Sequence, residues 1–165
     1  MKILVISDSH GSTKNILTIK KQIKKVDLVI HCGDGTEDFD FIKDYMKCDL
    51  WGVSGNMDSL NIYNAPKVID REIEGKKIHI EHGDAFNDWN SGRRLNNETL
   101  LQAAKASGYD VIFYGHTHVQ SIVNEDGIWL INPGSISLPK DSCYPSYIIM
   151  ETDGEGGFSF NGERL

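Results

Sequence analysis

Two histidines separated by one residue stand in the segment Gly115-His116-Thr117-His118, directly after the apolar run 111–114. Residues two apart in an extended chain lie on the same face, so His116 and His118 can direct their imidazole rings toward one point. Such a pair can bind a metal ion, whereas the alternative is two solvated loop histidines. The ends of the other apolar runs distinguish between these interpretations.

Four further apolar runs are followed directly by side chains that can bind a metal ion. These side chains are Asp8 and His10, Asp34, Asn56 and Asp58, and His82 and Asp84. A glycine accompanies most of them, and glycine allows sharp turns and close approach of the backbone. Four of the six histidines lie in these five places, which random placement does not readily produce. The five strand ends therefore predict one shared site.

The types of these side chains indicate which metal ions the site would bind. The set contains carboxylates, one amide and imidazoles but no thiolate, which suits borderline to hard divalent ions with open coordination positions. Counted as two or three carboxylates, one amide and four imidazoles, these are about seven ligands, which exceeds what one catalytic ion with a bound water requires. They suit two ions about 3.5–4 Å apart that share a carboxylate and clamp a phosphoryl group. We expect two ions per chain, Mn²⁺ first, with Ni²⁺, Fe²⁺, Co²⁺, Zn²⁺ or Mg²⁺ as alternatives.

The elements that must position these residues begin with a strand–helix–strand unit. Residues 2–7 and 27–32 are patterned as buried strands, and a helix capped by Ser12 or Thr13 extends to Val26 between them. A second helix over 36–47 and a third strand over 48–55 continue the alternation. This order favours parallel strands joined by crossover helices.

The pattern changes after residue 66. A hairpin turns at Glu74-Gly75, a helix over 96–108 is closed by Gly108, a strand covers 110–115, and two further hairpins follow, the first turning at Asp126-Gly127. We expect an α/β fold of two mixed sheets packed together with helices outside, forming a single domain over residues 1–165. Its site should lie at the carboxyl ends of the early strands.

Composition and charge limit the class of protein. A hydrophobic content of 39% with 25% charged residues is typical of a globular chain and excludes a disordered one. The apolar run at the N-terminus is too short for a signal peptide or a membrane helix, so we expect a cytoplasmic protein without membrane association. A net charge of −7 disfavours long nucleic acids. A small phosphate ester stays compatible, because bound divalent cations reverse the local field.

The ordered set D-x-H, G-D, G-N-x-D, H-G-D and G-H-T-H resembles the motifs of the calcineurin-like metallophosphoesterase superfamily. More narrowly, it resembles the small single-domain bacterial and archaeal phosphodiesterases of that family. The resemblance implies a four-layer α/β/β/α sandwich. It also implies that Asp8, His10 and His118 hold a first metal, that Asn56, His82 and His116 hold a second, and that Asp34 bridges both.

The resemblance further implies a phosphodiesterase that cleaves small or nucleotide-like substrates by in-line attack of a metal-bridging hydroxide. Met57 stands where many members have a histidine directly after G-N, and a thioether cannot donate a proton to a leaving group. This departure disfavours the alternative of a phosphomonoesterase with the same metal centre. A non-catalytic scaffold like the related retromer subunit is a second alternative, which the intact ligand set disfavours.

Several residues carry more specific expectations. Asp34, Asn56, His10 and Asp58 are the candidate catalytic residues, and Asp58 should orient a loop or a histidine unless it merely caps a helix. Arg93 and Arg94 could bind a phosphate, or they could begin a solvated helix. In the same way, Trp89 could stack on a base or anchor its loop. Three residues, His31, His79 and Cys32, lie within strand patterns and are expected to be structural. Homo-oligomer formation is left open.

Overall fold

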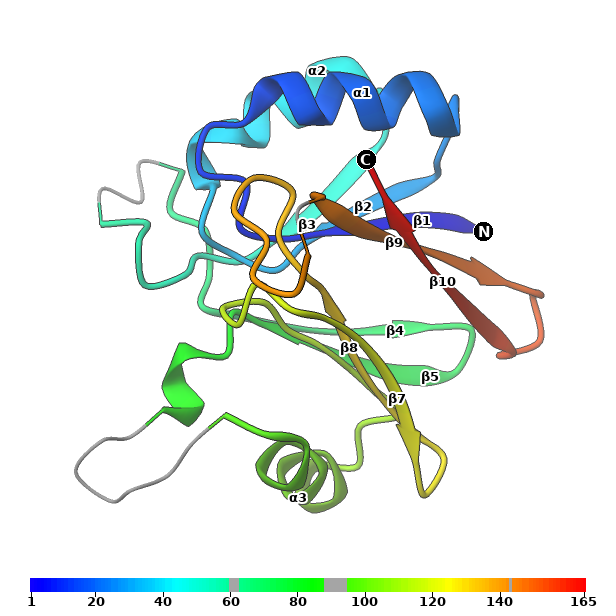
Figure 1. The fold of residues 1–165 in the computed structure, drawn as a ribbon. Helices are drawn as coiled ribbons and strands as arrows, with labels where there is room; N and C mark the ends of the chain where they lie inside the picture. Colours follow the sequence, from blue (N-terminus) through cyan, green and yellow to red (C-terminus); the bar gives the residue numbers. More distant parts are fainter. Residues whose placement is uncertain (60–62, 88–94, 143) are drawn as a thin grey trace.

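The computed structural model describes residues 1–59, 63–87, 95–142 and 144–165, and these residues form two five-stranded sheets. The first sheet contains β1 (Lys2–Ile6), β2 (Leu28–His31), β3 (Asp49–Gly52), β9 (Ser146–Thr152) and β10 (Phe158–Arg164). The second sheet contains β4 (Val68–Ile73), β5 (Lys76–Glu81), β6 (Val111–Phe113), β7 (Gln120–Glu125) and β8 (Ile128–Pro133). Their strand orders are β10-β9-β1-β2-β3 and β4-β5-β6-β8-β7 (Figure 1).

Helices cover the outer face of each sheet. Over the first sheet lie α1 (Thr13–Ile23) and α2 (Phe39–Met46), and over the second lies α3 (Asn97–Ser107) (Figure 1). Two short 3₁₀ helices, η1 (Thr36–Asp38) and η2 (Asp84–Phe86), follow β2 and β5. The layers therefore run α/β/β/α, and the predicted fold class is confirmed.

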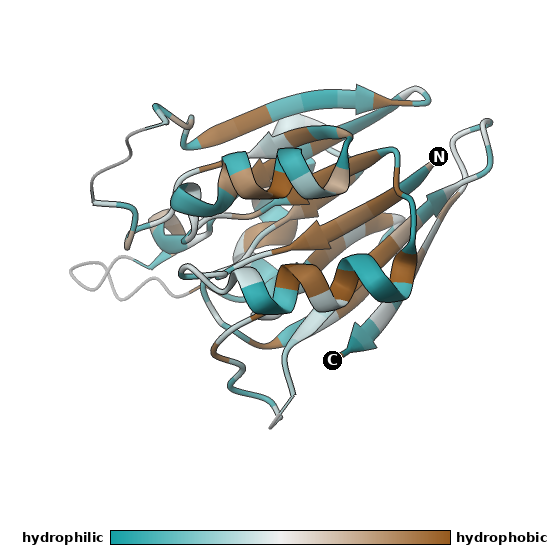
Figure 2. Cartoon of the chain, turned by 90° about the horizontal axis from the view of Figure 1, so that it is seen from above, coloured by the Kyte–Doolittle hydropathy of each residue, from teal (hydrophilic) through white to brown (hydrophobic). Residues whose placement is uncertain are grey.

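Alternating side chains of the central strands form the layers of the core. In β1, Ile3 and Val5 pack between the two sheets, whereas Leu4 and Ile6 pack beneath the helices. Ile16 of α1 and Ile42 of α2 are fully buried against that second face. Figure 2 shows apolar residues on the strands that lie below these two helices. A nearly continuous apolar run is what a strand buried on both faces requires.

The early helices differ in detail from the prediction. The first ends at Ile23 rather than Val26, because Lys24 adopts a left-handed φ of 57°. Val26 is still buried, but it lies outside the helix. Ser12, one of the two predicted candidates, occupies the N-cap position, but its side chain makes no capping hydrogen bond. The segment 36–47 begins as η1 before it becomes α2.

The later turns follow the prediction closely. Gly108 ends α3 in the left-handed region at φ 72°, and Asn96 and Thr99 form a capping box at the start of that helix. Both hairpin turns, Glu74-Gly75 and Asp126-Gly127, have positive φ at their two central residues, as tight two-residue turns require. None of the helices in the described ranges is long and apolar enough to span a membrane.

Candidate metal centre

The carboxyl ends of two sets of parallel strands meet at one edge of the sandwich. Strands β1, β2 and β3 are parallel in the first sheet, and β5, β6 and β8 are parallel in the second. Backbone bonds join these ends: Asp8 N–H donates to Gly33 C=O at 3.0 Å, and Gly115 N–H donates to His82 C=O at 3.0 Å. Between the sheets, His116 N–H donates to Asp8 Oδ2 at 3.2 Å. All seven predicted ligands are thereby brought together.

One group of ligand atoms consists of Asp8, His10 and His118, which offer atoms within 4.8 Å of one another. The rings of His10 and His118 lie 5.6 Å apart, and His118 Nε2 lies 3.1 Å from Asp8 Oδ1. Apart from this contact with the His118 ring, the buried Asp8 Oδ1 has no hydrogen-bond partner among the described residues, and the buried His10 Nε2 has none. Buried polar atoms rarely stay unpaired, so this group fits a bound cation.

A second group surrounds Asn56. Its Oδ1 lies 3.0 Å from His116 Nδ1 and 3.2 Å from His82 Nε2, and Asp34 Oδ2 lies 3.2 Å from the same His82 atom. His82 Nδ1–H donates to the carbonyl of Cys32 at 2.8 Å, so a neutral His82 ring presents the Nε2 lone pair to these oxygens. Lone pairs that converge in this way require a proton or a metal ion between them.

Two carboxylates lie between the groups. Atoms of Asp8, Asp34 and His82 also lie within 4.8 Å of one another, so Asp8 takes part in both sets. The family resemblance makes Asp34 the bridging ligand instead. Both carboxylates are buried at the junction, and the bridging role of Asp34 stays a prediction.

The pKa values of three side chains at the site are shifted by contacts between carboxylates and imidazoles. Hydrogen bonding to Asp8 raises the pKa of His118. Burial of His82 disfavours its charged form, but the hydrogen bond that its ring donates to Asp34 and the charge of Asp8 together raise its pKa. Burial of Asp34 is likewise outweighed by His82, which lowers the pKa of that carboxyl. A metal ion would replace the shared proton of such a pair, so metal binding should release protons.

The backbone at the site is strained. Among the candidate ligands, Asp8, His10, Asp34, His116 and His118 all have φ between 44° and 67°. Left-handed φ is uncommon outside glycine and costs about 1–3 kcal/mol per residue, so the surrounding structure must enforce it. The strain is concentrated where the ligand atoms converge.

Glycines allow the strand ends to approach one another. A side chain at Gly55 would overlap the Asp34 carboxylate, and one at Gly115 would overlap Ser7 Oγ and approach Asp8. Glycine was expected at these ends for close backbone approach, and here it is required by the contact itself.

Asp58 orients a loop rather than a histidine. Its carboxylate accepts hydrogen bonds from the N–H groups of Asp34, Gly35, Thr36 and Gly55 at 2.7–3.0 Å, and from the Thr36 hydroxyl at 3.1 Å. These bonds fix the loop that carries Asp34 against the loop that carries Asn56. Of the expected roles, loop orientation matches these contacts, and the effect of Asp58 on catalysis stays a prediction.

His31 is a buried structural histidine directly behind the site. Gly33 N–H donates to its Nδ1 at 3.2 Å, so Nε2 carries the proton and donates to Ser9 Oγ at 2.9 Å. Burial lowers the pKa of His31 to about 4. The neutral ring thus joins the loop after β1 to the loop after β2.

This lowered pKa predicts a pH dependence of stability. The unfolded chain binds a proton at His31 below about pH 6.5 and the folded chain only below about pH 4, so folding stability should fall as the pH falls through that window. The loss should approach about 3 kcal/mol at the acid end. Urea unfolding in a chelator at several pH values would measure it, with His31→Gln expected to flatten the profile. Parallel profiles for the two proteins would contradict this assignment.

The remaining expectations concern residues that the structure describes and residues that it does not. His79 bonds Asp70 at 2.7 Å and Glu81 at 3.1 Å on β4 and β5, away from the ligand groups, and Cys32 is fully buried. Both residues have the structural roles expected. Three others, Arg93, Arg94 and Trp89, lie outside the described residues.

Sequence reasoning missed the turn after β8. Ser135 and Ser137 donate hydrogen bonds to the Asp8 carbonyl at 2.8 Å, and the Leu138 carbonyl accepts from His118 Nδ1–H at 2.6 Å. The rule that found the other ligands would also have found this turn, because polar residues follow the apolar run 128–131 directly.

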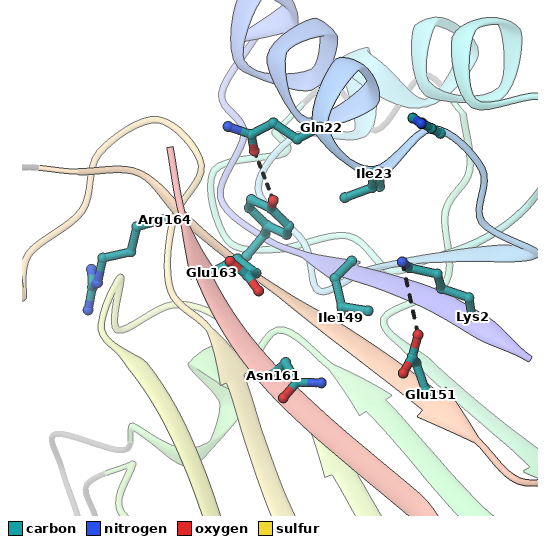
Figure 3. Close-up of a pocket in the computed structure, with 10 residues that line it drawn as sticks. Lys2, Gln22, Ile23, Ile149, Glu151, Asn161, Glu163 and Arg164 are labelled. Atoms are coloured by element: carbon teal, nitrogen blue, oxygen red, sulfur yellow. Dashed lines mark hydrogen bonds and ion pairs between the residues drawn. The ribbon is translucent and has the colours of Figure 1, made fainter.

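A cavity of about 540 Å³ lies away from the ligands. It is bounded by the end of α1 and by β1, β9 and β10, near Lys2 at the amino end of β1 (Figure 3). Lys2 approaches Glu151 at 4.0 Å across it, and Tyr147 donates to Gln22 at 2.9 Å. None of the seven predicted ligands lines this cavity, so cavity size does not identify the functional site here.

The family follows from comparison with known proteins. Residues 1–155 match the calcineurin-like phosphoesterase superfamily domain. The chain belongs to this superfamily. It is therefore a metallophosphoesterase, a hydrolase of phosphoric esters, and the resemblance seen in the motifs is confirmed.

Individual relatives agree with this membership. A probable metallophosphoesterase of Methanocaldococcus jannaschii is 39% identical over 145 residues, covering 85% of this chain and 70% of that protein. A protein of the same archaeon named a phosphodiesterase is 32% identical over 154 residues, covering 81% and 83%. The solved structure of Entamoeba histolytica Vps29 with zinc has a TM-score of 0.76 at 20% identity, covering 99% of each chain, and shows the shared fold alone.

Proposed function

We propose that this metallophosphoesterase is a dinuclear phosphodiesterase acting on small or nucleotide-like esters. Asp8, His10 and His118 would hold one ion, Asn56, His82 and His116 the other, and Asp34 would contact both. The observation that carries the proposal is the convergence of unpaired and mutually facing lone pairs from both sheets on one buried locus. Two divalent ions there supply charge stabilisation and an activated water for in-line displacement at phosphorus.

The protein's own residues position the ester and neutralise its charge. Asn56 can donate its amide N–H to a phosphoryl oxygen while its Oδ1 faces His82 and His116. His10, half-buried beside His118, is a second candidate donor to that phosphoryl group. Donors fixed before the reaction stabilise developing charge without reorganisation.

Met57 favours diesters over monoesters. Its side chain is 64% exposed at the rim of the site, and its N–H donates to Asp34 Oδ1 at 2.8 Å. A thioether supplies no proton to a departing alkoxide, so substrates with better leaving groups should react faster. The relative named a phosphodiesterase supports the same preference.

Metal add-back to stripped protein tests the proposal. Hydrolysis of bis(p-nitrophenyl) phosphate and p-nitrophenyl phosphate would be measured with Mn²⁺, Ni²⁺, Mg²⁺ or Zn²⁺, alongside metal content per chain. We expect two ions per chain and faster cleavage of the diester, with Mn²⁺ the most effective. A preference for the monoester would leave the metal centre in place and reject the proposed diester specificity. Two bound ions without hydrolysis would favour the scaffold alternative.

Other features of the proposal stay predictions. They are the choice of Mn²⁺, a phosphate contact by Arg93 or Arg94, cytoplasmic localisation and a single domain over residues 1–165, whereas homo-oligomer formation is left open.

A further inference from the structure

A fully buried hydroxyl lies at the centre of the turn after β8. Ser135 Oγ donates to the Asp8 carbonyl at 2.8 Å and accepts from the N–H groups of Ser137 at 3.1 Å and Leu138 at 2.8 Å. A serine hydroxyl has one donor and two acceptor positions, so all of them are used. This one side chain therefore fixes the turn and ties it to the strand end that carries Asp8.

The turn after β8 also orients His118. The Leu138 carbonyl accepts from His118 Nδ1–H at 2.6 Å, and Lys140 N–H donates to the His118 carbonyl at 3.0 Å. A neutral ring with its proton on Nδ1 carries its lone pair on Nε2, which faces Asp8 Oδ1 at 3.1 Å. The tautomer suited to metal binding thus depends on where the Leu138 carbonyl is held.

The two ligand groups depend on this support to different degrees. Asp8 and His118 are both fixed by the turn after β8, whereas His82 is oriented by the Cys32 carbonyl at 2.8 Å. Among the described contacts, none joins Ser135 directly to Asn56, His82 or His116, and the link to that group runs through Asp8, whose Oδ2 accepts from His116 N–H at 3.2 Å. A change at Ser135 should therefore weaken the group of Asp8 and His118 more than the other.

We propose that Ser135 is a positioning residue that sets the metal affinity of the Asp8–His10–His118 group more strongly than that of the Asn56–His82–His116 group. It acts through the Asp8 backbone and the Leu138 carbonyl. The inference rests on the metal centre of the proposed function. Groups that orient metal ligands typically change affinity by about 10- to 100-fold when removed, which is the effect expected for Ser135→Ala.

A Zn²⁺ titration of the full chain, followed through the imidazole ¹⁵N signals, would resolve the two groups. In Ser135→Ala, the His10 and His118 signals should respond only at roughly 10- to 100-fold higher Zn²⁺, whereas the Zn²⁺ concentration at which the His82 and His116 signals respond should rise by a smaller factor. Equal weakening of both groups, or of neither, would overturn the proposal.

Two further serines provide matched controls. Ser146 is equally buried and donates one hydrogen bond, to the Pro133 carbonyl at 2.8 Å, so Ser146→Ala measures the general cost of losing a buried hydroxyl in this region. Ser137 Oγ donates only to the Asp8 carbonyl and does not support Leu138. We expect no selective loss in Ser146→Ala and a smaller loss in Ser137→Ala. A selective loss of the same size in Ser146→Ala would refute the assignment.

The tautomer of His118 separates this inference from the proposed function. In metal-free protein at about pH 9, where imidazoles are largely neutral, the Leu138 carbonyl favours the His118 proton on Nδ1 and the Asp8 carboxylate favours it on Nε2, so the fraction on Nδ1 should be higher in the wild type than in Ser135→Ala. This result needs neither bound metal nor hydrolysis. Failure of the wild type to bind two ions would reject the proposed function, whereas an unchanged tautomer in the variant would reject the role of Ser135.

Discussion

Asp34→Asn should reduce metal-dependent diester hydrolysis by at least about 10³-fold while leaving the protein folded. The Asp34 side chain is 3% exposed and lies 3.2 Å from His82 Nε2. Asparagine has nearly the same shape, and its Oδ1 can still accept the hydrogen bond from Met57 N–H. The substitution removes the negative charge that a pair of cations requires between them, so fewer ions should also bind.

Initial rates with bis(p-nitrophenyl) phosphate, metal content per chain and thermal unfolding would test this expectation together. Asp44→Asn is the matched control, because Asp44 is exposed on α2, far from the ligand groups in the fold. A variant that kept more than about a tenth of the wild-type rate with full metal content would show that Asp34 is not an essential ligand. Asp8 would then be the shared carboxylate, as its place in both ligand groups allows.

Asp58→Ala should be the most destabilising of the substitutions considered, by about 3 kcal/mol or more in the free energy of unfolding. The Asp58 carboxylate accepts five hydrogen bonds, four of them from backbone N–H groups. These bonds outweigh the effect of burial and lower its pKa, so the ionised form is present at neutral pH. Alanine would leave those donors without an acceptor. The loop that carries Asp34 should then move, reducing the hydrolysis rate by roughly 10- to 100-fold.

Asp58→Asn gives a graded test of the same contacts. Asparagine keeps one acceptor oxygen but places an NH₂ group against N–H donors, so its stability should lie between that of the wild type and that of Asp58→Ala. Urea unfolding at pH 7 measures this order, with Asp44→Ala as the exposed control. If Asp58→Ala were as stable as Asp44→Ala, the five hydrogen bonds would not be holding the loop.

The sequence by itself determined the class of elements and the identity of the candidate ligands. Continuous apolar runs marked the buried strands, and paired turn residues such as Glu74-Gly75 marked the hairpins, because these signals are local in the chain. The candidate ligands, among them Asp8 and His116, could be identified because a polar residue directly after a buried strand must lie at the edge of its sheet. Parallel pairing then brought those edges together.

Local detail was less predictable where local signals compete. Val26 fits the helical spacing of the first helix, yet the helix ends before Lys24. Val26 is buried, but it lies outside the helix. Ser12 is a favourable capping type, but no capping bond forms there. Helix ends depend on how the following strand must enter the sheet, and residue spacing does not contain that information.

Only the tertiary structure decided which group supports which ligand. Asp58 fixes the loop of Asp34, 24 residues away, and Ser135 fixes Asp8, 127 residues away. The tautomers of His82 and His118 depend on the carbonyls of Cys32 and Leu138, which come from distant strand ends. Such pairings depend on the order of strands within two sheets and on how the sheets face each other. Local periodicity specifies which side of each element is buried, but it does not specify the partner that covers it.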